Sequence, residues 1–236
     1  MCKELSEEVG FTVTRSKLRR FLKKLGFIWK RFRKSLKGKQ DPKIYEAKLA
    51  ELTELIELYK SNYIDLFYGD ESGFNMQGYI PYGWQPKGKH IEIIPSKTKS
   101  RSVFGLMSLD NQLDAYTCNG SMNSAAIIAF INDFEKRIKK PTVIVLDNAP
   151  IHHSLEFQLK VKEWKEKDLY IFFLPKYSPH LNPIEILWRK IKYEWLAYEN
   201  ITDQDCLEIE LERILNNFGS EYTINFKERK VSFISV

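Results

Sequence analysis

Two segments near the start of the chain repeat apolar residues at helical spacing. From Thr14, apolar positions three and four residues apart end at Gly26, which predicts a short helix with Thr14 as N-cap and Gly26 as its stop. Asp41 followed by Pro42 begins a second helix that continues to about Ser61. We interpret this second helix either as a connection packed on the next domain or as a dimerisation helix.

The rest of the chain alternates strand and helix signals. Four β-rich runs separated by turn residues come first, at 64–70, 90–95, 102–109 and 114–120. Helical patterns then alternate with apolar strands, in the order helix 123–138, strand 142–147, helix 154–166, strand 169–175 and helix 182–196. The continuous apolar run 142–147 is typical of a buried parallel strand. This order predicts an α/β fold in which helices flank a mixed sheet.

Composition narrows the class of protein. The chain has 236 residues, 43% of them hydrophobic, which suffices for a sizeable core and excludes a disordered or collagen-like chain. No apolar run approaches the roughly 20 residues that span a bilayer, so we expect no membrane partner. Three widely spaced cysteines form no CxxC motif and predict a reducing, cytoplasmic setting. Neither a P-loop nor a zinc-type spacing of His and Cys occurs.

Positive charge is concentrated in residues 15–39, which contain no Asp or Glu. Such a block is either a solvated, disordered tail or a surface that binds a polyanion. Apolar residues are interleaved with the cations, so we interpret the segment as folded and facing DNA, with its first helix similar to the second helix of a helix-turn-helix. The cations assigned to DNA binding are Arg15, Lys17, Arg19, Arg20, Lys23, Lys24, Lys30, Arg31, Arg33 and Lys34.

Three acidic residues are candidates for catalysis. Asp70 and Asp147 each end a predicted strand, and each could instead be an ordinary turn residue. Glu185 is the third residue of a helix with Asn182 as predicted N-cap, where a capping box, taken alone, is the better explanation. The wide apolar stripe of that helix weakens this explanation, because it predicts that the helix packs on the sheet with Glu185 beside the contact. If the three carboxylates converged, they would suit Mg²⁺, and two such ions would assist displacement at a phosphodiester.

Four strings of residues carry a family resemblance. YGDESGFN, GWQPKG, VLDNAPIHHS and PKYSPHLNPIEILWRKIK closely resemble, in order and separation, the DDE transposases of bacterial insertion sequences in the mariner-like superfamily. The resemblance covers about residues 11–200. It implies a ribonuclease-H-like catalytic domain with a mixed five-stranded sheet, in which Asp70, Asp147 and Glu185 are catalytic and bind two Mg²⁺ or Mn²⁺ ions. The implied reaction cuts DNA at the transposon ends and joins the freed 3′-hydroxyl to target DNA, commonly at a TA step.

The resemblance also suggests how the chain is organised. We expect a partial helix-turn-helix segment over 1–40, a linker helix over 41–62, the catalytic domain over 63–200, and a C-terminal helix and tail over 201–236. Relatives usually carry two helix-turn-helix units, so we expect that the first unit and the start of the second are absent, as in a truncated relic or a frameshift product. Expected partners are double-stranded DNA, a second copy of the chain on that DNA, and a separate upstream polypeptide that supplies the missing helices. The expected location is the bacterial cytoplasm, in association with the nucleoid.

Several other residues and functions have competing interpretations. Asn148, His152 and His153 could steady a metal-bound phosphate or could form a turn and a helix start, while Trp84 could pack a turn or stack on DNA. The cations that could line a phosphate path or simply be solvated are Lys87, Lys89, Lys97, Lys99 and Arg101. Alternative functions are a truncated or inactive transposase-derived DNA-binding protein and a ribonuclease-H-like nuclease acting on RNA:DNA hybrids. The basic helix and the strings GWQPKG and PHLNPIE favour the transposase over the nuclease.

Overall fold

The computed structural model describes residues 2–27, 41–75, 101–196, 201 and 203–226, and the chain divides into two compact units, Met1–Leu36 and Lys37–Val236. In the first unit, helix α1 (Cys2–Val9) precedes helix α2 (Arg15–Lys24). Thr14 caps α2 as predicted, since its side chain accepts a hydrogen bond from the backbone N–H of Lys17. Gly26, with φ of 79°, follows the end of the helix in the left-handed region that favours glycine.

The second unit is built on a five-stranded sheet with the strand order β3-β2-β1-β4-β5. Its strands are β1 (Asp65–Phe74), β2 (Arg101–Ser108), β3 (Leu113–Asn119), β4 (Thr142–Leu146) and β5 (Leu169–Phe173). β1, β2 and β3 pair antiparallel, whereas β4 pairs parallel with both β1 and β5. The predicted mixed sheet is therefore confirmed. The strand predicted at 90–95 lies outside the described residues.

β1 is longer than the sequence pattern predicted. It pairs with β2 as far as Phe74, so Asp70 lies inside the strand and not at its end. The parallel pairing with β4 stops earlier, at Tyr68 and Val145. Asp70 therefore lies just past the last residue pair that β1 forms with β4, close to the point where β4 itself ends.

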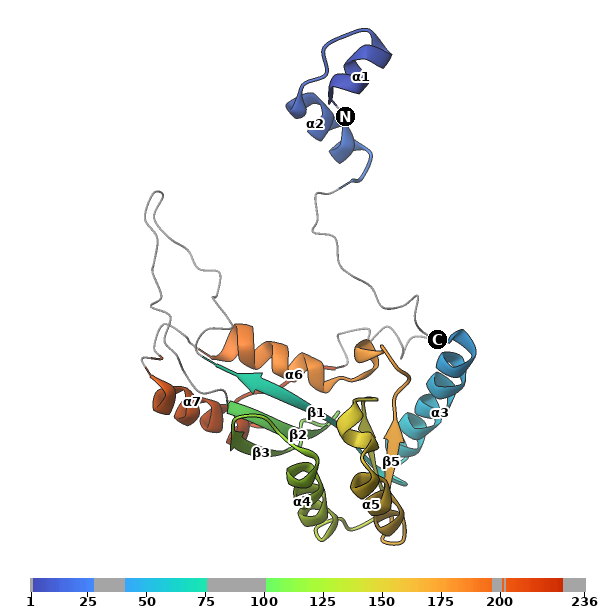
Figure 1. Cartoon of the computed structure of the whole chain (residues 1–236), viewed down its shortest axis with the longest axis vertical. Coiled ribbons are helices and arrows are strands. Elements are labelled where there is room, and N and C mark those ends of the chain that lie inside the picture. The colour runs from blue at the N-terminus through green and yellow to red at the C-terminus, as the bar shows by residue number, and fades with distance from the viewer. Residues whose placement is uncertain (1, 28–40, 76–100, 197–200, 202, 227–236) are drawn as a thin grey trace. The chain divides into compact units, whose positions relative to one another are not determined.

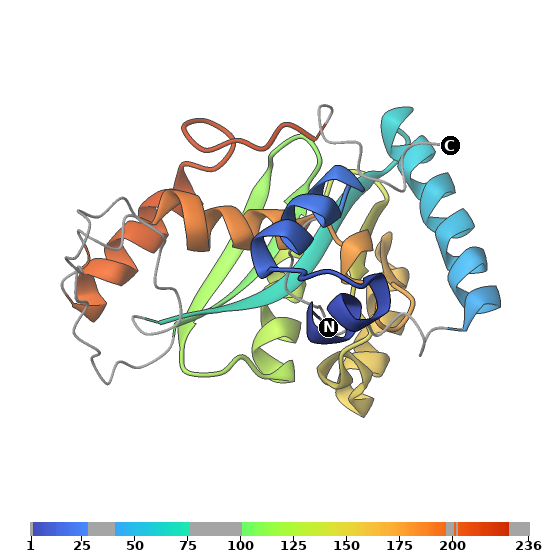
Figure 2. The same cartoon turned by 90° about the horizontal axis from the view of Figure 1, so that it is seen from above.

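Helices cover both faces of the sheet. On one face, the core includes side chains of α3 (Pro42–Lys60), α6 (Ile184–Lys190) and α7 (Gln204–Asn216). On the other face, the core is formed with α4 (Ser124–Glu135) and α5 (Leu155–Lys165). Figure 1 shows α6 on one side of the sheet and α4 and α5 on the other, and Figure 2 shows α6 crossing the strands. The predicted helix 182–196 is a shorter α-helix followed by a π-helical turn, Ile191–Trp195.

The alternation of side chains along β1 separates two neighbouring acids. Leu66 and Tyr68 belong to the core beneath α6, whereas Phe67 belongs to the core beneath α4 and α5. Because successive side chains of a strand point to opposite faces, Asp70 is on the α6 face and Glu71 is on the opposite face.

Helix α3 packs on the sheet. Asp41 caps it as predicted, accepting hydrogen bonds from the backbone N–H groups of Lys43 and Ile44. Leu52 and Ile56 are buried in the core beneath α6, which favours the connecting-helix interpretation over a dimerisation helix. Among the described residues, no helix combines the length and apolar character needed to cross a membrane.

Candidate active site

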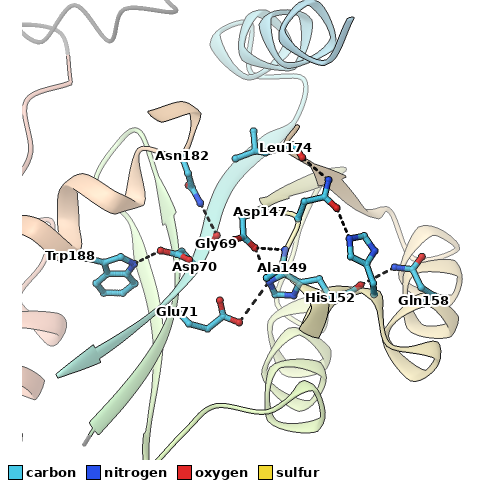
Figure 3. Close-up of polar contacts among 12 residues, drawn as sticks. Gly69, Asp70, Glu71, Asp147, Ala149, His152, Gln158, Leu174, Asn182 and Trp188 are labelled. Carbon is cyan, nitrogen blue, oxygen red and sulfur yellow. Dashed lines mark hydrogen bonds and ion pairs between the residues drawn. The ribbon is translucent and has the colours of Figure 1, made fainter. Parts of the chain in front are cut away.

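One pocket is lined by all three candidate carboxylates. Asp70 of β1, Asp147 directly after β4 and Glu185 in the first turn of α6 line a cavity of about 470 Å³. Along β4, Val143 and Val145 belong to the core beneath α6, so the same alternation turns Asp147 toward the face that Asp70 occupies. Figure 3 shows Asp70 on β1 and Asp147 nearby, just past the end of the neighbouring strand β4. The topology thus gathers acids that are far apart in the sequence.

Asp70 is held in an unfavourable environment for a negative charge. Burial, followed by the nearby charges of Glu185, Glu71 and Asp147, raises the pKa of Asp70 to about 8. Its carboxylate accepts a hydrogen bond from the indole of Trp188, whose Nε1–H is donated to Asp70 Oδ2 over 3.0 Å. A positive charge in the pocket would therefore stabilise ionised Asp70.

The pKa values of Asp147 and Glu185 are shifted in opposite directions. The pKa of Asp147 is lowered, first by its contact with His152, whose Nε2 is 3.5 Å from Asp147 Oδ1, and also by the backbone N–H of Ala149, which donates to the same oxygen over 3.0 Å. Burial raises the pKa of Glu185, although Lys192 opposes this effect. The pocket therefore combines one carboxylate that ionises readily with two that resist ionisation.

The donor set fits hard divalent ions. Three carboxylates that repel one another supply only oxygen ligands, which Mg²⁺ and Ca²⁺ prefer. As they stand, however, no group of three or more His, Cys, Asp or Glu side chains in the described part of the chain could hold one ion. Figure 3 shows the carboxylate of Asp70 turned toward Trp188. Binding an ion between the carboxylates therefore requires side-chain rotation.

Asn182 does not cap α6, contrary to the prediction. The N-cap is Pro183, without a side-chain hydrogen bond, and the backbone N–H of Asn182 donates to the carbonyl of Pro179. The side-chain amide of Asn182 instead donates to the carbonyl of Gly69 on β1, over 3.0 Å. The capping box that would have explained Glu185 is therefore not formed. The sequence pattern at Asn182 was interpreted as a local helix start, whereas its side chain makes a long-range contact with the sheet.

Two residues beside the carboxylates were missed or given too little weight. Glu71 follows Asp70 directly, and burial raises its pKa. His152 is 1% exposed, and its Nε2 lies between Asp147 and Glu71, 3.7 Å from Glu71 Oε1. The sequence offered one signal for Glu71, which is its place next to Asp70 in a strand. The alternation of side chains along a strand puts Glu71 on the face of the sheet opposite to that of Asp70. Nothing local in the sequence revealed that His152 is buried.

The remaining polar side chains near the pocket form hydrogen bonds with other segments of the fold. Asn148 donates from its side-chain amide to the carbonyl of Leu174 over 2.9 Å, and its Oδ1 is hydrogen-bonded to His153. His180, just before Asn182 in the sequence, is hydrogen-bonded through Nε2 to the hydroxyl of Tyr45 on α3, 2.9 Å away.

The structure describes only part of the predicted DNA-binding surface. Six of the assigned cations are exposed on α2, namely Arg15, Lys17, Arg19, Arg20, Lys23 and Lys24. Arg101 forms an ion pair with Glu208, so a role in a phosphate path is not favoured for it. The other cations considered, together with Trp84, lie outside the described residues: Lys30, Arg31, Arg33, Lys34, Lys87, Lys89, Lys97 and Lys99.

Comparison with known proteins agrees with this arrangement. The family model of the DDE superfamily endonucleases matches residues 65–208. An uncharacterised 39 kDa protein of insertion element IS630 from Shigella sonnei is 25% identical over 193 residues, which cover 80% of this chain and 54% of that protein. The chain thus spans about half the length of this curated relative.

Solved structures of the Mos1 mariner transposase share the fold. The Mos1 strand transfer complex superposes with a TM-score of 0.65 at 16% identity, covering 91% of this chain and 67% of that one. The Mos1 catalytic domain gives a TM-score of 0.50 at 12% identity, over 80% of this chain and 85% of that one. The predicted ribonuclease-H-like sheet flanked by helices is therefore confirmed. Because the family model covers more than half of the sequence, the chain belongs to the DDE superfamily endonucleases.

Proposed function

We propose that this chain is the transposase of an insertion sequence, which cuts DNA phosphodiesters at the element ends and joins the 3′-hydroxyl to target DNA. The observation that carries the proposal is the single pocket lined by Asp70, Asp147 and Glu185, in a chain of the DDE superfamily. The relative from IS630 supports the link to an insertion element, and the Mos1 structures include complexes with transposon ends.

Asp70, Asp147 and Glu185 would hold two divalent ions, Mg²⁺ or Mn²⁺. Mos1 complexes with Mn and with Mg support this choice of metals. When bound, such ions activate the attacking oxygen and stabilise the leaving oxygen of a phosphodiester. Asp147 presents a carboxylate that is readily ionised, because His152 and the backbone N–H of Ala149 lower its pKa. Asn182 fastens the start of α6, and with it Glu185, to β1 beside Asp70.

The proposed partner is double-stranded DNA. The exposed cations of α2 suit the phosphate backbone, because Lys and Arg contacts to phosphates release counterions and supply sequence-independent affinity. The division into a DNA-binding segment, a linker helix, a catalytic domain and a C-terminal helix stays a prediction. So do the homodimer on DNA, the separate upstream polypeptide and the location near the nucleoid.

Plasmid nicking and strand joining test the proposal. The full chain is incubated with supercoiled plasmid and a labelled oligonucleotide in Mg²⁺, Mn²⁺, Ca²⁺ or EDTA. Nicking and transfer of the label are expected with Mg²⁺ or Mn²⁺ and are expected to fall to background in Asp70→Asn, Asp147→Asn and Glu185→Gln. Asp133→Asn, at an exposed position on α4, is the control and should retain activity.

The outcomes separate the two candidate functions. Nicking that persists in EDTA, or that all three isosteric variants retain, would contradict the proposed site. Tight DNA binding without metal-dependent nicking would favour the alternative, a transposase-derived DNA-binding protein without catalysis.

A further inference from the structure

Helix α6 presents two side chains to the region of Asp70. Trp188 donates its Nε1–H to Asp70 Oδ2, and Glu185 lines the same pocket as Asp70. The two residues are three positions apart, so they lie on one face of the helix, one turn from each other. Helix α6, which supplies Glu185, thus also contacts Asp70 through Trp188.

The indole of Trp188 occupies space that a side chain on β2 would need. Gly105 is the residue that pairs with Asp70 across β1 and β2. A Cβ atom on Gly105 would lie 2.9 Å from Cη2 and 3.2 Å from Cζ2 of Trp188, too close without a shift of the indole. Directly opposed residues of antiparallel strands are neighbours on the same face. The missing side chain of Gly105 therefore lets the indole lie beside Asp70.

We propose that Trp188 is a positioning residue that fixes the carboxylate of Asp70 for metal binding, and that Gly105 provides the space this requires. The inference rests on the proposed function, because it assigns Asp70 a metal ion. An indole N–H suits the task chemically, since it is a donor without charge. It orients one carboxylate oxygen but leaves the negative charge uncompensated, whereas a Lys or Arg in the same place would compete with the cation.

A purely structural role for the indole makes a different prediction. Trp188 is 3% exposed, and a buried Trp needs a hydrogen-bond acceptor for its N–H wherever it lies. Trp164 shows this situation away from the pocket. It is 1% exposed, it belongs to the core beneath α4 and α5, and its Nε1–H donates to Asn132 Oδ1 over 2.8 Å. Trp164 is therefore a matched control for the loss of one buried indole hydrogen bond.

The test measures Mn²⁺ binding to the full chain by using electron paramagnetic resonance to determine the concentration of free Mn²⁺. Trp188→Phe removes the donor while keeping an aromatic ring, and we expect it to weaken Mn²⁺ binding by roughly 10- to 100-fold, as loss of an outer-sphere partner typically does. Trp164→Phe should leave Mn²⁺ affinity unchanged although it lowers the melting temperature. Equal Mn²⁺ affinities of the wild type and Trp188→Phe, or equal losses in the two Trp variants, would overturn the inference.

Asp70→Asn separates the inference from the function on which it rests. If Asp70→Asn loses Mn²⁺ binding while Trp188→Phe keeps it, only the positioning role fails. If Asp70→Asn itself binds Mn²⁺ as the wild type does, the proposed metal site fails, and the inference with it.

Gly105→Ala provides a second test of the inference if Trp188→Phe does not fold. The added methyl should displace the indole and weaken Mn²⁺ binding in the same direction, without removing the N–H. In the double variant Gly105→Ala and Trp188→Phe, the smaller ring should accept the methyl, so the two losses should not add. A folded Gly105→Ala protein with unchanged Mn²⁺ affinity would overturn the inference.

Discussion

The side-chain amide of Asn182 donates a hydrogen bond to the backbone carbonyl of Gly69, 3.0 Å away, and thereby joins the turn before α6 to the middle of β1. A Cβ at Gly69 would lie 2.6 Å from Cδ2 of Leu146 on β4, so a side chain there would require Leu146 to shift. Strands β1 and β4 and the start of α6 therefore meet at this one residue. Asp70, Asp147 and Glu185 each lie within three residues of a member of this contact.

Replacing Asn182 should loosen this junction. Asn182→Ala leaves the carbonyl of Gly69 without this donor in a buried place, so we expect a loss of about 1 to 3 kcal/mol in the free energy of unfolding. Nicking activity should also fall, because Glu185 begins the helix that Asn182 fastens. Urea unfolding and plasmid nicking measure the two effects. Asn217→Ala, which removes a similar amide-to-carbonyl bond at the exposed end of α7, should leave nicking unchanged. An Asn182→Ala protein with wild-type stability would contradict this account.

The raised pKa of Asp70 should make the metal-free protein less stable as the pH rises. The folded state holds the Asp70 proton up to a pH of about 8, whereas an unfolded chain releases it near the ordinary value of 3.8. Between these values the folded state binds more protons, so this contribution to stability is present in full below about pH 4 and is lost as the pH rises through 8. Urea unfolding in EDTA between pH 4 and 9 measures it. Asp70→Asn should flatten the pH profile, and an unchanged slope would show that other groups dominate.

Divalent ions should reverse this destabilisation. An ion bound only to the folded state, at 100 times its dissociation constant, stabilises by about 2.7 kcal/mol. For a chain of this size, we therefore expect Mg²⁺ to raise the melting temperature by roughly 5 to 10 °C. Asp147→Asn should reduce the shift. A K⁺ salt at the same ionic strength is the control, and an equal shift with K⁺ would indicate screening rather than binding.

The sequence predicted the sheet and its helices well because those signals are local. The caps at Thr14 and Asp41 depend on residues within one turn, and the buried strand 142–147 is a continuous apolar run. Asn182 shows the limit. Its place before Pro183 is a typical helix start, yet its amide reaches a strand 113 residues away in the sequence. No local pattern encodes such a contact, and for the same reason the bond from Trp188 to Asp70 could not be predicted.

The cations of α2 should account for much of the salt dependence of DNA binding. Each phosphate contact contributes about −0.9 to the slope of log affinity against log salt concentration. Replacing the six exposed cations of α2 with Gln should reduce that slope by up to about 5 and should weaken binding to different duplexes alike. Replacing Lys162 and Lys165 of α5 with Gln is the control. If the α2 variant kept the wild-type slope, the DNA contacts would lie elsewhere.

Glu71 and Asp70 are adjacent, and we expect them to respond differently to loss of charge. Glu71 is on the opposite face of β1 and lies near His152, so Glu71→Gln should retain metal-dependent nicking within about tenfold, whereas Asp70→Asn should abolish it. Burial raises the pKa of Glu71, so its ionised form destabilises the fold. Glu71→Gln should therefore raise the melting temperature at pH 8 relative to the wild type.

The pH dependence of that gain identifies its cause. Near pH 4 the carboxyl of Glu71 is largely protonated in the folded protein, so it carries little charge to destabilise the fold and the gain in melting temperature should be small. The gain should grow as the pH rises through the raised pKa of Glu71. Glu156→Gln, at an exposed position on α5, should show no comparable trend. Loss of nicking in Glu71→Gln equal to that in Asp70→Asn would contradict the separation by strand alternation. It would make Glu71 a fourth acidic residue of the metal site, reached by rotation past His152.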